Sequence, residues 1–353
     1  MLDAGARSET SASDLRPPPQ PPNPFRVAEK SFKAYKDGRP CDAMKRLVDF
    51  AVPDDDGVFS RVPVSDLAPP WLHAAQIYSL QGVDGFRFIR CPFDHDTQLR
   101  LASTALREWI EPPSATNLEL HGVGPLTNLW EGHERDPHGS SLSRLTWATV
   151  GYQYQWTERQ YDPSKHSPFP AELEQLGSDL AAACGWVLHP EAAIINLYGV
   201  WSTMGGHVDD AEPCQTAPIV SISLGLDAVY LLGRETKESE PVAIRLRSGD
   251  VVLQGGQSRS FVHGVPRVLA GTLPDELSER RYADRAAGRL ATVARWLSDH
   301  RLNINVRQCW DRDAGTHELG LRRSDASERS SASHAGGAVI ENGDNLNHKK
   351  RRL

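Results

Sequence analysis

The sequence predicts a mainly β fold with flanking helices, organised around a double-stranded β-helix, which is also called a jelly roll. From residue 145 onward, short strand-like segments alternate with glycine-rich turns, as expected for two facing sheets. In one of these segments Val220, Ile222 and Leu224 alternate with serines, which indicates a strand with one buried face. The predicted strands cover residues 147–154, 192–198, 219–225, 228–233, 242–247, 251–254, 260–265 and 302–308.

Helices are predicted where apolar residues recur at helical spacing, over residues 26–35, 94–110 and 170–184 and within 270–300. The second helix stops at the Pro112-Pro113 pair, and Gly185 ends the third. Residues 111–143 are rich in Gly, His and Pro and are expected to form a long loop.

These elements group into a predicted domain organisation. A flexible, proline-rich arm precedes a mostly helical and loop extension, and the main domain follows with a helical insertion before its last strand. In that insertion five residues at helical spacing predict a helix of four or more turns, namely Tyr282, Ala286, Leu290, Val293 and Leu297. A Ser-, Gly-, Asn- and charge-rich tail is expected to be disordered. The boundaries are 1–24 for the arm, 25–140 for the extension, 141–311 for the main domain, 270–300 for its insertion and 312–353 for the tail.

Composition excludes several classes of protein. No run approaches the roughly 18 apolar residues that a membrane span needs, and the first residues lack the pattern of a secretory signal. The five cysteines are widely spaced, which favours reduced thiols over a zinc or iron-sulfur site. We therefore expect an intracellular, monomeric protein without a membrane partner. With a net charge of −7, any nucleic acid must be bound by a local basic surface.

A candidate metal site is formed by His207, Asp209 and His263. Two imidazoles and one carboxylate bind Fe(II) on one face and leave three positions open. One intervening residue on an extended segment puts His207 and Asp209 on the same side. The alternative is a hydrogen-bonded surface pair and a core histidine. His189-Pro190-Glu191 offers similar ligands, but its proline indicates a turn that leads into the strand 192–198.

A candidate anion site lies on the last predicted strand. Arg301, Asn303 and Arg307 share one face, and burying them is costly unless an anion pairs with the guanidinium groups. A dicarboxylate such as 2-oxoglutarate supplies that anion. Alternatively the arginines reach solvent and Leu302, Ile304 and Val306 form the buried face. Asn196 and Tyr198 alternate on an earlier strand and could contact the same cosubstrate, although an ordinary polar face gives the same pattern.

Taken together, these motifs resemble the AlkB family of Fe(II)/2-oxoglutarate dioxygenases. The matching segments are 196–198, 207–209, 218–225, 248–251, 258–263 and 301–307. The segment Leu-Thr-Trp-Ala-Thr-Val-Gly-Tyr-Gln-Tyr at 145–154 and the insertion after 268 are similar to the eukaryotic type-1 branch of the family. The resemblance covers roughly residues 28–310 and is dense from 145.

The resemblance implies a role for each candidate residue. Fe(II), 2-oxoglutarate and O₂ would be the cofactor and cosubstrates, and aromatic rings would contact a base extruded from nucleic acid. The bacterial family member has a second carboxylate two residues after its Asp ligand, where this chain has Ala211, so base specificity is expected to differ. The implied iron ligands are His207, Asp209 and His263; Arg301 and Tyr198 hold the distal carboxylate of 2-oxoglutarate; Arg307, Asn303 and Asn196 hold the end nearer the metal; and Trp147 and Tyr152 contact the base.

The implied reaction is oxidative demethylation of methylated bases in tRNA or DNA. An N-methyl group is hydroxylated and then lost as formaldehyde, while 2-oxoglutarate gives succinate and CO₂. Two alternatives are a hydroxylase or demethylase of a protein substrate and a non-catalytic binding protein with the same fold. The nucleus or the cytoplasm, or else the mitochondrion, is the expected location.

Two basic segments suggest further contacts. Arg281, Arg285 and Arg289 would form a stripe on the insertion helix that tracks a nucleic-acid backbone, or a merely solvated helix face. The Lys349–Arg352 segment is interpreted as a nuclear-import patch, a phosphate-binding tail or a solubilising end.

Overall fold

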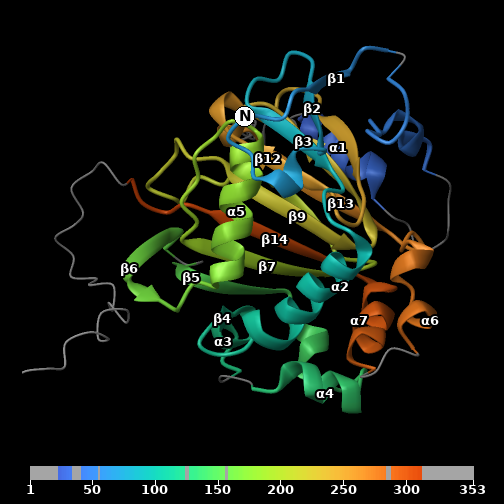
Figure 1. The fold of residues 1–353 in the computed structure, drawn as a ribbon, viewed down its shortest axis with the longest axis vertical. Helices are drawn as coiled ribbons and strands as arrows, with labels where there is room; N and C mark the ends of the chain where they lie inside the picture. The colour runs from blue at the N-terminus through green and yellow to red at the C-terminus, as the bar shows by residue number, and fades with distance from the viewer. Residues whose placement is uncertain are drawn as a thin grey trace, which may run out of the picture. The chain divides into compact units, whose positions relative to one another are not determined.

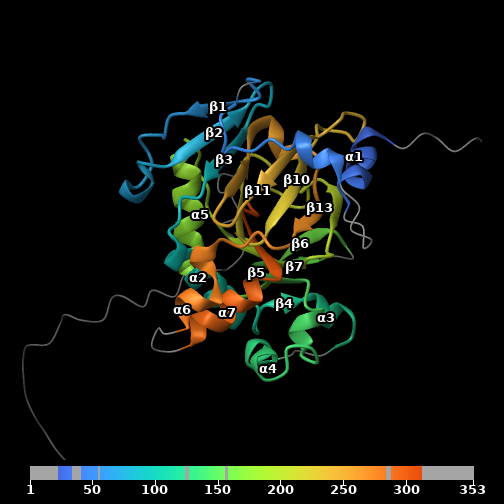
Figure 2. The same cartoon turned by 90° about the vertical axis from the view of Figure 1, so that its right-hand side faces the viewer.

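The computed structural model describes residues 23–33, 41–54, 56–123, 127–155, 158–283 and 288–311. Two antiparallel sheets dominate it, which confirms the predicted mainly β fold with flanking helices (Figures 1 and 2). The predicted tail and nearly all of the predicted arm lie outside the described residues.

The large sheet carries most of the strands. Its order is β1 (Phe59–Val62), β2 (Gln76–Leu80), β3 (Phe86–Arg90), β12 (Val251–Gln254), β9 (Ile219–Gly225), β14 (His300–Arg307), β7 (Ala192–Gly199), β5 (Trp147–Gln155) and β4 (Ala115–Thr116), with β6 (Gln160–His166) paired to β5. The small sheet has the order β11 (Val242–Leu246), β10 (Asp227–Leu232), β13 (His263–Leu269) and β8 (Met204–His207).

Strand β14 lies between β9 and β7 in the large sheet, and its residues are buried on both faces of that sheet. On one face Leu302, Ile304 and Val306 are fully buried in the main apolar core, together with residues of helix α5 (Ala171–Ala183). On the other face Arg301 and Arg307 are also buried, and they line a cavity. The sequence offered two alternatives for the buried face of this strand, the apolar one or the one with the arginines. In the structure both faces of β14 are buried.

The region 25–140, predicted to be mostly helical and loop, also contributes four short strands, β1 to β4, to the large sheet. Strand β3 pairs with β12, with Val252 opposite Phe88, and the ring of Phe88 stacks on that of Phe50 at 4.1 Å between centroids. These strands were not predicted from the sequence, because they are short and are separated by Pro, Asp and Gly residues. Helix α1 (Pro24–Phe32) and α2 (His95–Thr104), with the π-helical turn η3 (Ala105–Trp109), agree with the predicted helices.

The predicted loop 111–143 contains two short helices, α3 (Asn117–Leu120) and α4 (Leu129–Arg135). The carboxylate of Glu111 accepts hydrogen bonds from the backbone N–H groups of Asn128, at 2.8 Å, and Leu129, at 2.7 Å. This distant carboxylate satisfies N–H groups at the start of α4, and the fully buried Trp130 anchors the helix. Short helices capped from elsewhere in the chain leave no periodic signal in the sequence.

The predicted insertion helix is not continuous. It is divided into α6 (Glu279–Tyr282) and α7 (Arg289–Leu297), and residues 284–287 lie outside the described ones. Gly288 has a φ of 56°, a left-handed conformation that cannot continue a helix through this position. The described short helices elsewhere are η1 (Asp42–Arg46), η2 (Pro70–Leu72), η4 (Ser141–Arg144), η5 (Gly256–Ser260) and η6 (Asp275–Leu277).

Smaller differences concern strand limits. The strand predicted at 260–265 begins only at His263, because residues 256–260 form η5. Strands β6 and β8 were not predicted, since β8 is a four-residue segment containing two glycines. Within the described residues no helix is long and apolar enough to cross a membrane.

The contribution of the N-terminal strands to the core can be tested at Phe88, which is 1% exposed. We expect Phe88→Ala to lower the free energy of unfolding by about 3–5 kcal/mol, because it leaves a cavity between the sheets. Urea denaturation would measure the change. Val27→Ala, on the exposed face of α1 with 51% of Val27 accessible, serves as the control and should cost about 0.5 kcal/mol or less. Equal effects of the two substitutions would contradict the placement of β3 in the core.

Candidate functional site

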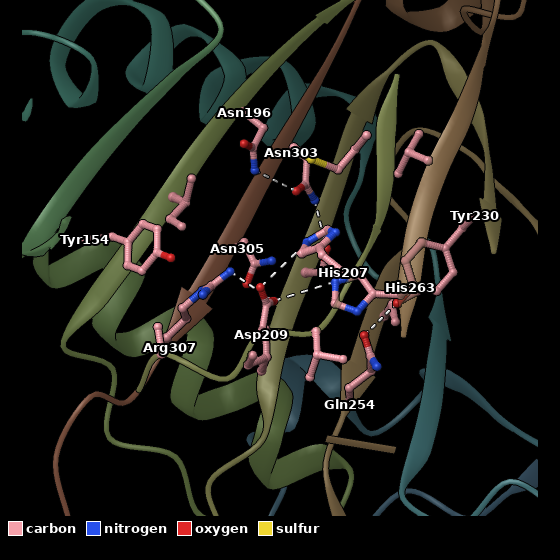
Figure 3. Close-up of a pocket in the computed structure, with 18 of the residues that line it drawn as sticks. Tyr154, Asn196, His207, Asp209, Tyr230, Gln254, His263, Asn303, Asn305 and Arg307 are labelled. Atoms are coloured by element: carbon pink, nitrogen blue, oxygen red, sulfur yellow. Dashed lines mark hydrogen bonds and ion pairs between the residues drawn. The ribbon is translucent and has the colours of Figure 1, made fainter. Parts of the chain in front are cut away.

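A cavity of about 310 Å³ lies between the two sheets and is lined largely by polar side chains (Figure 3). Strands β7, β9 and β14 supply one wall, and β8, β10 and β13 supply the opposite wall. Eight of the ten predicted site residues line it, namely Asn196, Tyr198, His207, Asp209, His263, Arg301, Asn303 and Arg307.

Three potential metal ligands converge at one end of this cavity. His207 ends β8 and His263 begins β13, and the two residues are register partners in the small sheet. Asp209 follows His207 by two residues. One ligand atom from each of the three lies within 4.8 Å of the others, and Nε2 of each imidazole is 3.7 Å from an oxygen of Asp209. Among the described residues this is the one such cluster.

The second nitrogen of each imidazole is held by a backbone carbonyl. Nδ1 of His207 lies 2.9 Å from the carbonyl oxygen of Gly205, and Nδ1 of His263 lies 3.2 Å from that of Phe261. A carbonyl oxygen only accepts, so each Nδ1 carries the hydrogen and each Nε2 presents a lone pair to the cavity. This arrangement is common for metal-binding histidines, whose other N–H is donated to a carbonyl or carboxylate.

The electrostatics of the cluster favour the protonation states that bind metal. Burial, together with the neighbouring His207, lowers the pKa of His263 to about 4, so this imidazole is neutral near pH 7. Burial alone would raise the pKa of Asp209, but the charge of Arg307 and the neighbouring His263 and His207 outweigh it and hold the pKa well below its ordinary value. Neutral imidazoles and an ionised carboxylate form the donor set that suits Fe(II).

A buried network of opposite charges holds Asp209 in place. Nη2 of Arg307 forms an ion pair with Oδ2 of Asp209 at 2.9 Å, and its Nη1 donates a hydrogen bond to Oε1 of Glu212 at 2.5 Å. Arg259 donates to the other oxygen of Glu212 at 2.9 Å and to the backbone carbonyl of Asp209. The Glu212 side chain is completely buried. Two guanidinium groups thus neutralise two carboxylates, and both terminal nitrogens of Arg307 are used within the protein.

Arg301, at the other end of β14, is a buried arginine without a carboxylate partner among the described residues. It is 2% exposed, its Nη2 donates to Ser223 Oγ at 3.0 Å, and its guanidinium lies over the ring of Tyr198 at 5.1 Å. Its Nε and Nη1 are buried without a hydrogen-bond partner, and no carboxylate of the described residues forms an ion pair with it. A buried cation with two free donors fits a carboxylate supplied by a ligand.

Asn196 and Asn303 form a pair in the cavity wall between these ends (Figure 3). Asn196 donates from Nδ2 to Oδ1 of Asn303 at 3.3 Å, and Asn303 donates to Ser221 Oγ at 2.8 Å and to the carbonyl of Ile222 at 3.0 Å. These contacts fix the orientation of both amides, so the wall facing a ligand is preorganised.

Several cavity residues were not predicted from the sequence. Tyr230 stacks near His263 and donates to Gln254 at 2.6 Å, and Asn305 carries a buried oxygen without a partner. Asn305 could have been found, because it alternates with Asn303 and Arg307 on the same strand. Glu212 and Arg259 had only weaker signals, a carboxylate three residues after Asp209 and an arginine in the segment that ends at His263.

The structure does not place the two predicted aromatic residues in the cavity wall. Trp147 is opposite Asn196 in register and shares its face of the sheet, but it is outside the set that lines the cavity. Tyr152 packs instead against the rings of His166 and Trp310, because the strand is irregular after Gly151, which has a φ of 74°. Tyr154 is the aromatic residue of β5 that lines the cavity.

The discounted segment His189-Pro190-Glu191 has a structural role. Glu191 accepts hydrogen bonds from the backbone N–H groups of Cys309 and Trp310, both at 2.9 Å, and the His189 N–H donates to Gln308 at 3.0 Å. These contacts join the start of β7 to the end of β14, away from the metal cluster.

The described part of the arginine stripe is exposed. Arg281 lies in α6 and Arg289 begins α7, whereas Arg285 lies outside the described residues, as does the segment Lys349–Arg352. The break between α6 and α7 means that these side chains do not share the face of one continuous helix.

Comparisons with known proteins agree with this geometry. The model of the 2OG-Fe(II) oxygenase superfamily matches residues 104–307, more than half of the chain. The tRNA demethylase abh1 of Schizosaccharomyces pombe is 31% identical, over 81% of this chain and 95% of that protein. The DNA N(6)-methyladenine demethylase ALKBH1A of Arabidopsis thaliana is 32% identical, over 80% and 95%. The human nucleic acid dioxygenase ALKBH1 is 34% identical, over 68% and 69%.

Metal binding can be tested without a substrate. We expect His207→Ala, Asp209→Ala and His263→Ala each to abolish or severely weaken Co(II) binding, because each removes one of three converging ligands. The Co(II) absorption spectrum and calorimetry would measure binding to the apoprotein. His189→Ala is the matched control and should bind Co(II) as the unchanged protein does. Retention of binding in any of the three ligand variants, or its loss in the control, would contradict the site.

Proposed function

This chain belongs to the 2OG-Fe(II) oxygenase superfamily, and on that premise we propose that it oxidatively demethylates methylated bases in nucleic acid, either tRNA or DNA. The observation that carries the proposal is the joint presence, in one cavity, of the His207–Asp209–His263 cluster and the unpaired cation Arg301. The cluster suits Fe(II), and the cation suits one end of 2-oxoglutarate.

Three side chains of the protein would hold the metal at one end of the cavity. When bound, iron together with O₂ and 2-oxoglutarate supplies the oxidation that hydroxylates a methyl group. His207, Asp209 and His263 would bind it through two Nε2 atoms and one carboxylate oxygen. Arg307 and Arg259 keep Asp209 ionised and fixed, so that the carboxylate does not turn away when the cavity takes up ligands.

Other side chains would orient the cosubstrate. Arg301 would pair with the distal carboxylate of 2-oxoglutarate through its two free donors, with Tyr198 beneath its guanidinium group. Asn196, Asn303 and the remaining Nε of Arg307 would contact the part nearer the metal. Because Arg307 already pairs with two carboxylates, its main contribution in this proposal is to position Asp209.

Two residues that line the cavity, Tyr154 and Arg159, favour a nucleic-acid substrate. Tyr154 at the end of β5 and Arg159 just before β6 both line the cavity, and Arg159 lies 3.6 Å from Asp210 next to the metal ligand Asp209. Their side chains offer an aromatic face and an exposed guanidinium, the groups that stack on a base and contact phosphate. The relatives are named for tRNA, DNA and RNA substrates, so a direct assay must choose among these.

The activity would be tested by incubating the enzyme with Fe(II), ascorbate and 2-oxoglutarate in the presence of total tRNA or genomic DNA. Modified nucleosides would be quantified by mass spectrometry, together with formaldehyde and succinate. We expect a methylated nucleoside to decrease with matching formaldehyde release, and no decrease with Asp209→Ala. Succinate formation that depends on a protein substrate, with every nucleoside unchanged, would favour the protein hydroxylase. No succinate with any substrate would favour a non-catalytic binding protein.

The cosubstrate role of Arg301 has a kinetic consequence. We expect Arg301→Lys to raise the KM for 2-oxoglutarate by on the order of 100-fold, because an ammonium group on a flexible stem cannot reproduce the planar, fixed donors of the buried guanidinium. The kcat at saturating 2-oxoglutarate should change much less. Arg281→Lys, at an exposed position, is the control. An unchanged KM in Arg301→Lys would show that the distal carboxylate binds elsewhere.

A further inference from the structure

We propose that Glu29, on the N-terminal helix α1, is a positioning residue for the metal ligand His207 and acts on it through a single peptide group. The proposal rests on the metal-binding part of the proposed function and is independent of the substrate. Glu29 is far from the ligands in sequence and does not line the cavity. It is nevertheless 9% exposed, although it is an acidic residue on a helix at the surface of the small sheet (Figure 2).

The contact is made at the peptide bond between Gly205 and Gly206. Oε1 of Glu29 accepts a hydrogen bond from the N–H of Gly206 at 2.6 Å. The carbonyl oxygen of Gly205, at the other end of the same peptide group, accepts the hydrogen bond from Nδ1 of His207 at 2.9 Å. A carboxylate, a peptide group and an imidazole therefore form one chain of hydrogen bonds, which ends at the Nε2 that faces Asp209.

This series of hydrogen bonds affects His207 in two ways. It fixes the plane of the peptide group and with it the direction of the His207 ring, because both ends of the peptide are held. It also polarises the carbonyl toward the imidazole, since a negative charge attracts the amide hydrogen and neighbouring hydrogen bonds strengthen one another. When the carbonyl of Gly205 accepts the hydrogen bond from Nδ1 more strongly, Nε2 becomes a better electron-pair donor to a metal ion.

The packing of α1 places the carboxylate at this position. The ring of Phe25, which is completely buried, fills the space left by Gly206 and Gly233. A Cβ atom at Gly206 would lie 2.4 Å from that ring, so only glycine permits the helix to approach so closely. The second oxygen of Glu29 accepts from Arg26 at 2.7 Å, but the Arg26 side chain is 57% exposed and contributes little neutralisation.

The experiment measures metal binding, not turnover. Co(II) would be added to apoprotein of the full chain, with the dissociation constant taken from calorimetry and the ligand field from the visible absorption bands. We expect Glu29→Ala to weaken Co(II) binding by on the order of 10-fold and to change the absorption bands, within the range seen for residues that orient metal ligands. Glu29→Gln keeps an acceptor oxygen without the charge and should lie between Glu29→Ala and the unchanged protein.

Two controls separate this role from a general effect of helix packing. Phe32→Ala removes a buried apolar contact of α1 and leaves the carboxylate, and Arg26→Ala removes only the exposed partner. Both should bind Co(II) nearly as the unchanged protein does. If Glu29→Ala does not fold, Glu29→Gln is compared with Phe32→Ala instead.

The Co(II) experiment distinguishes a wrong role for Glu29 from a wrong metal site. If the unchanged protein does not bind Co(II), the metal centre is wrong and the role of Glu29 falls with it. If the unchanged protein binds but Glu29→Ala and Glu29→Gln match it in affinity and spectrum, the positioning role is wrong and the metal centre stands. Equal weakening in Phe32→Ala would also overturn the proposal, because helix packing would then suffice as the cause.

Discussion

The buried pairing of Arg307 with Asp209 and Glu212 is the constraint on which the site depends. An unpaired charge at these positions would be strongly destabilising, because burial removes its hydration and nothing else in the wall replaces it. Arg307 ends the central strand of the large sheet, whereas Asp209 and Glu212 lie in the segment between β8 and β9. The pairing therefore ties the metal-binding segment to the opposite sheet and keeps the carboxylate ionised.

The two arginines on this face of β14 differ in whether their charge is paired within the protein. Arg307 is neutralised within the protein, while Arg301 is buried to the same degree and lacks a carboxylate partner among the described residues. Burying the unpaired Arg301 destabilises the folded protein, and a bound dicarboxylate would offset this penalty by pairing with the guanidinium. This asymmetry gives the cavity a direction, with the metal ligands beside the neutralised arginine and the anion site at the other end.

Most of the metal and anion sites could be predicted from the sequence, because the spacings that define them span only a few residues. Alternation on β14 puts Arg301, Asn303 and Arg307 on one face, and the His-x-Asp spacing places His207, the last residue of β8, close to Asp209 just beyond the strand. The role of Glu29 could not be predicted, since it depends on how α1 packs on a distant strand. Likewise the strands before residue 91 join the roll through pairing with β12, which no local pattern encodes. Tyr152 does not line the cavity, because an irregularity after Gly151 breaks the alternation of β5.

One cavity would hold a metal and a dicarboxylate at opposite ends of the same strand face. Anomalous diffraction from crystals grown with Mn(II) and 2-oxoglutarate would test it most directly. We expect a single strong peak between Nε2 of His207, Nε2 of His263 and the carboxylate of Asp209. We also expect the 2-oxoglutarate to extend from that metal to the guanidinium of Arg301. A peak bound by other residues, or a 2-oxoglutarate whose carboxylates do not reach Arg301, would show that the site is arranged differently.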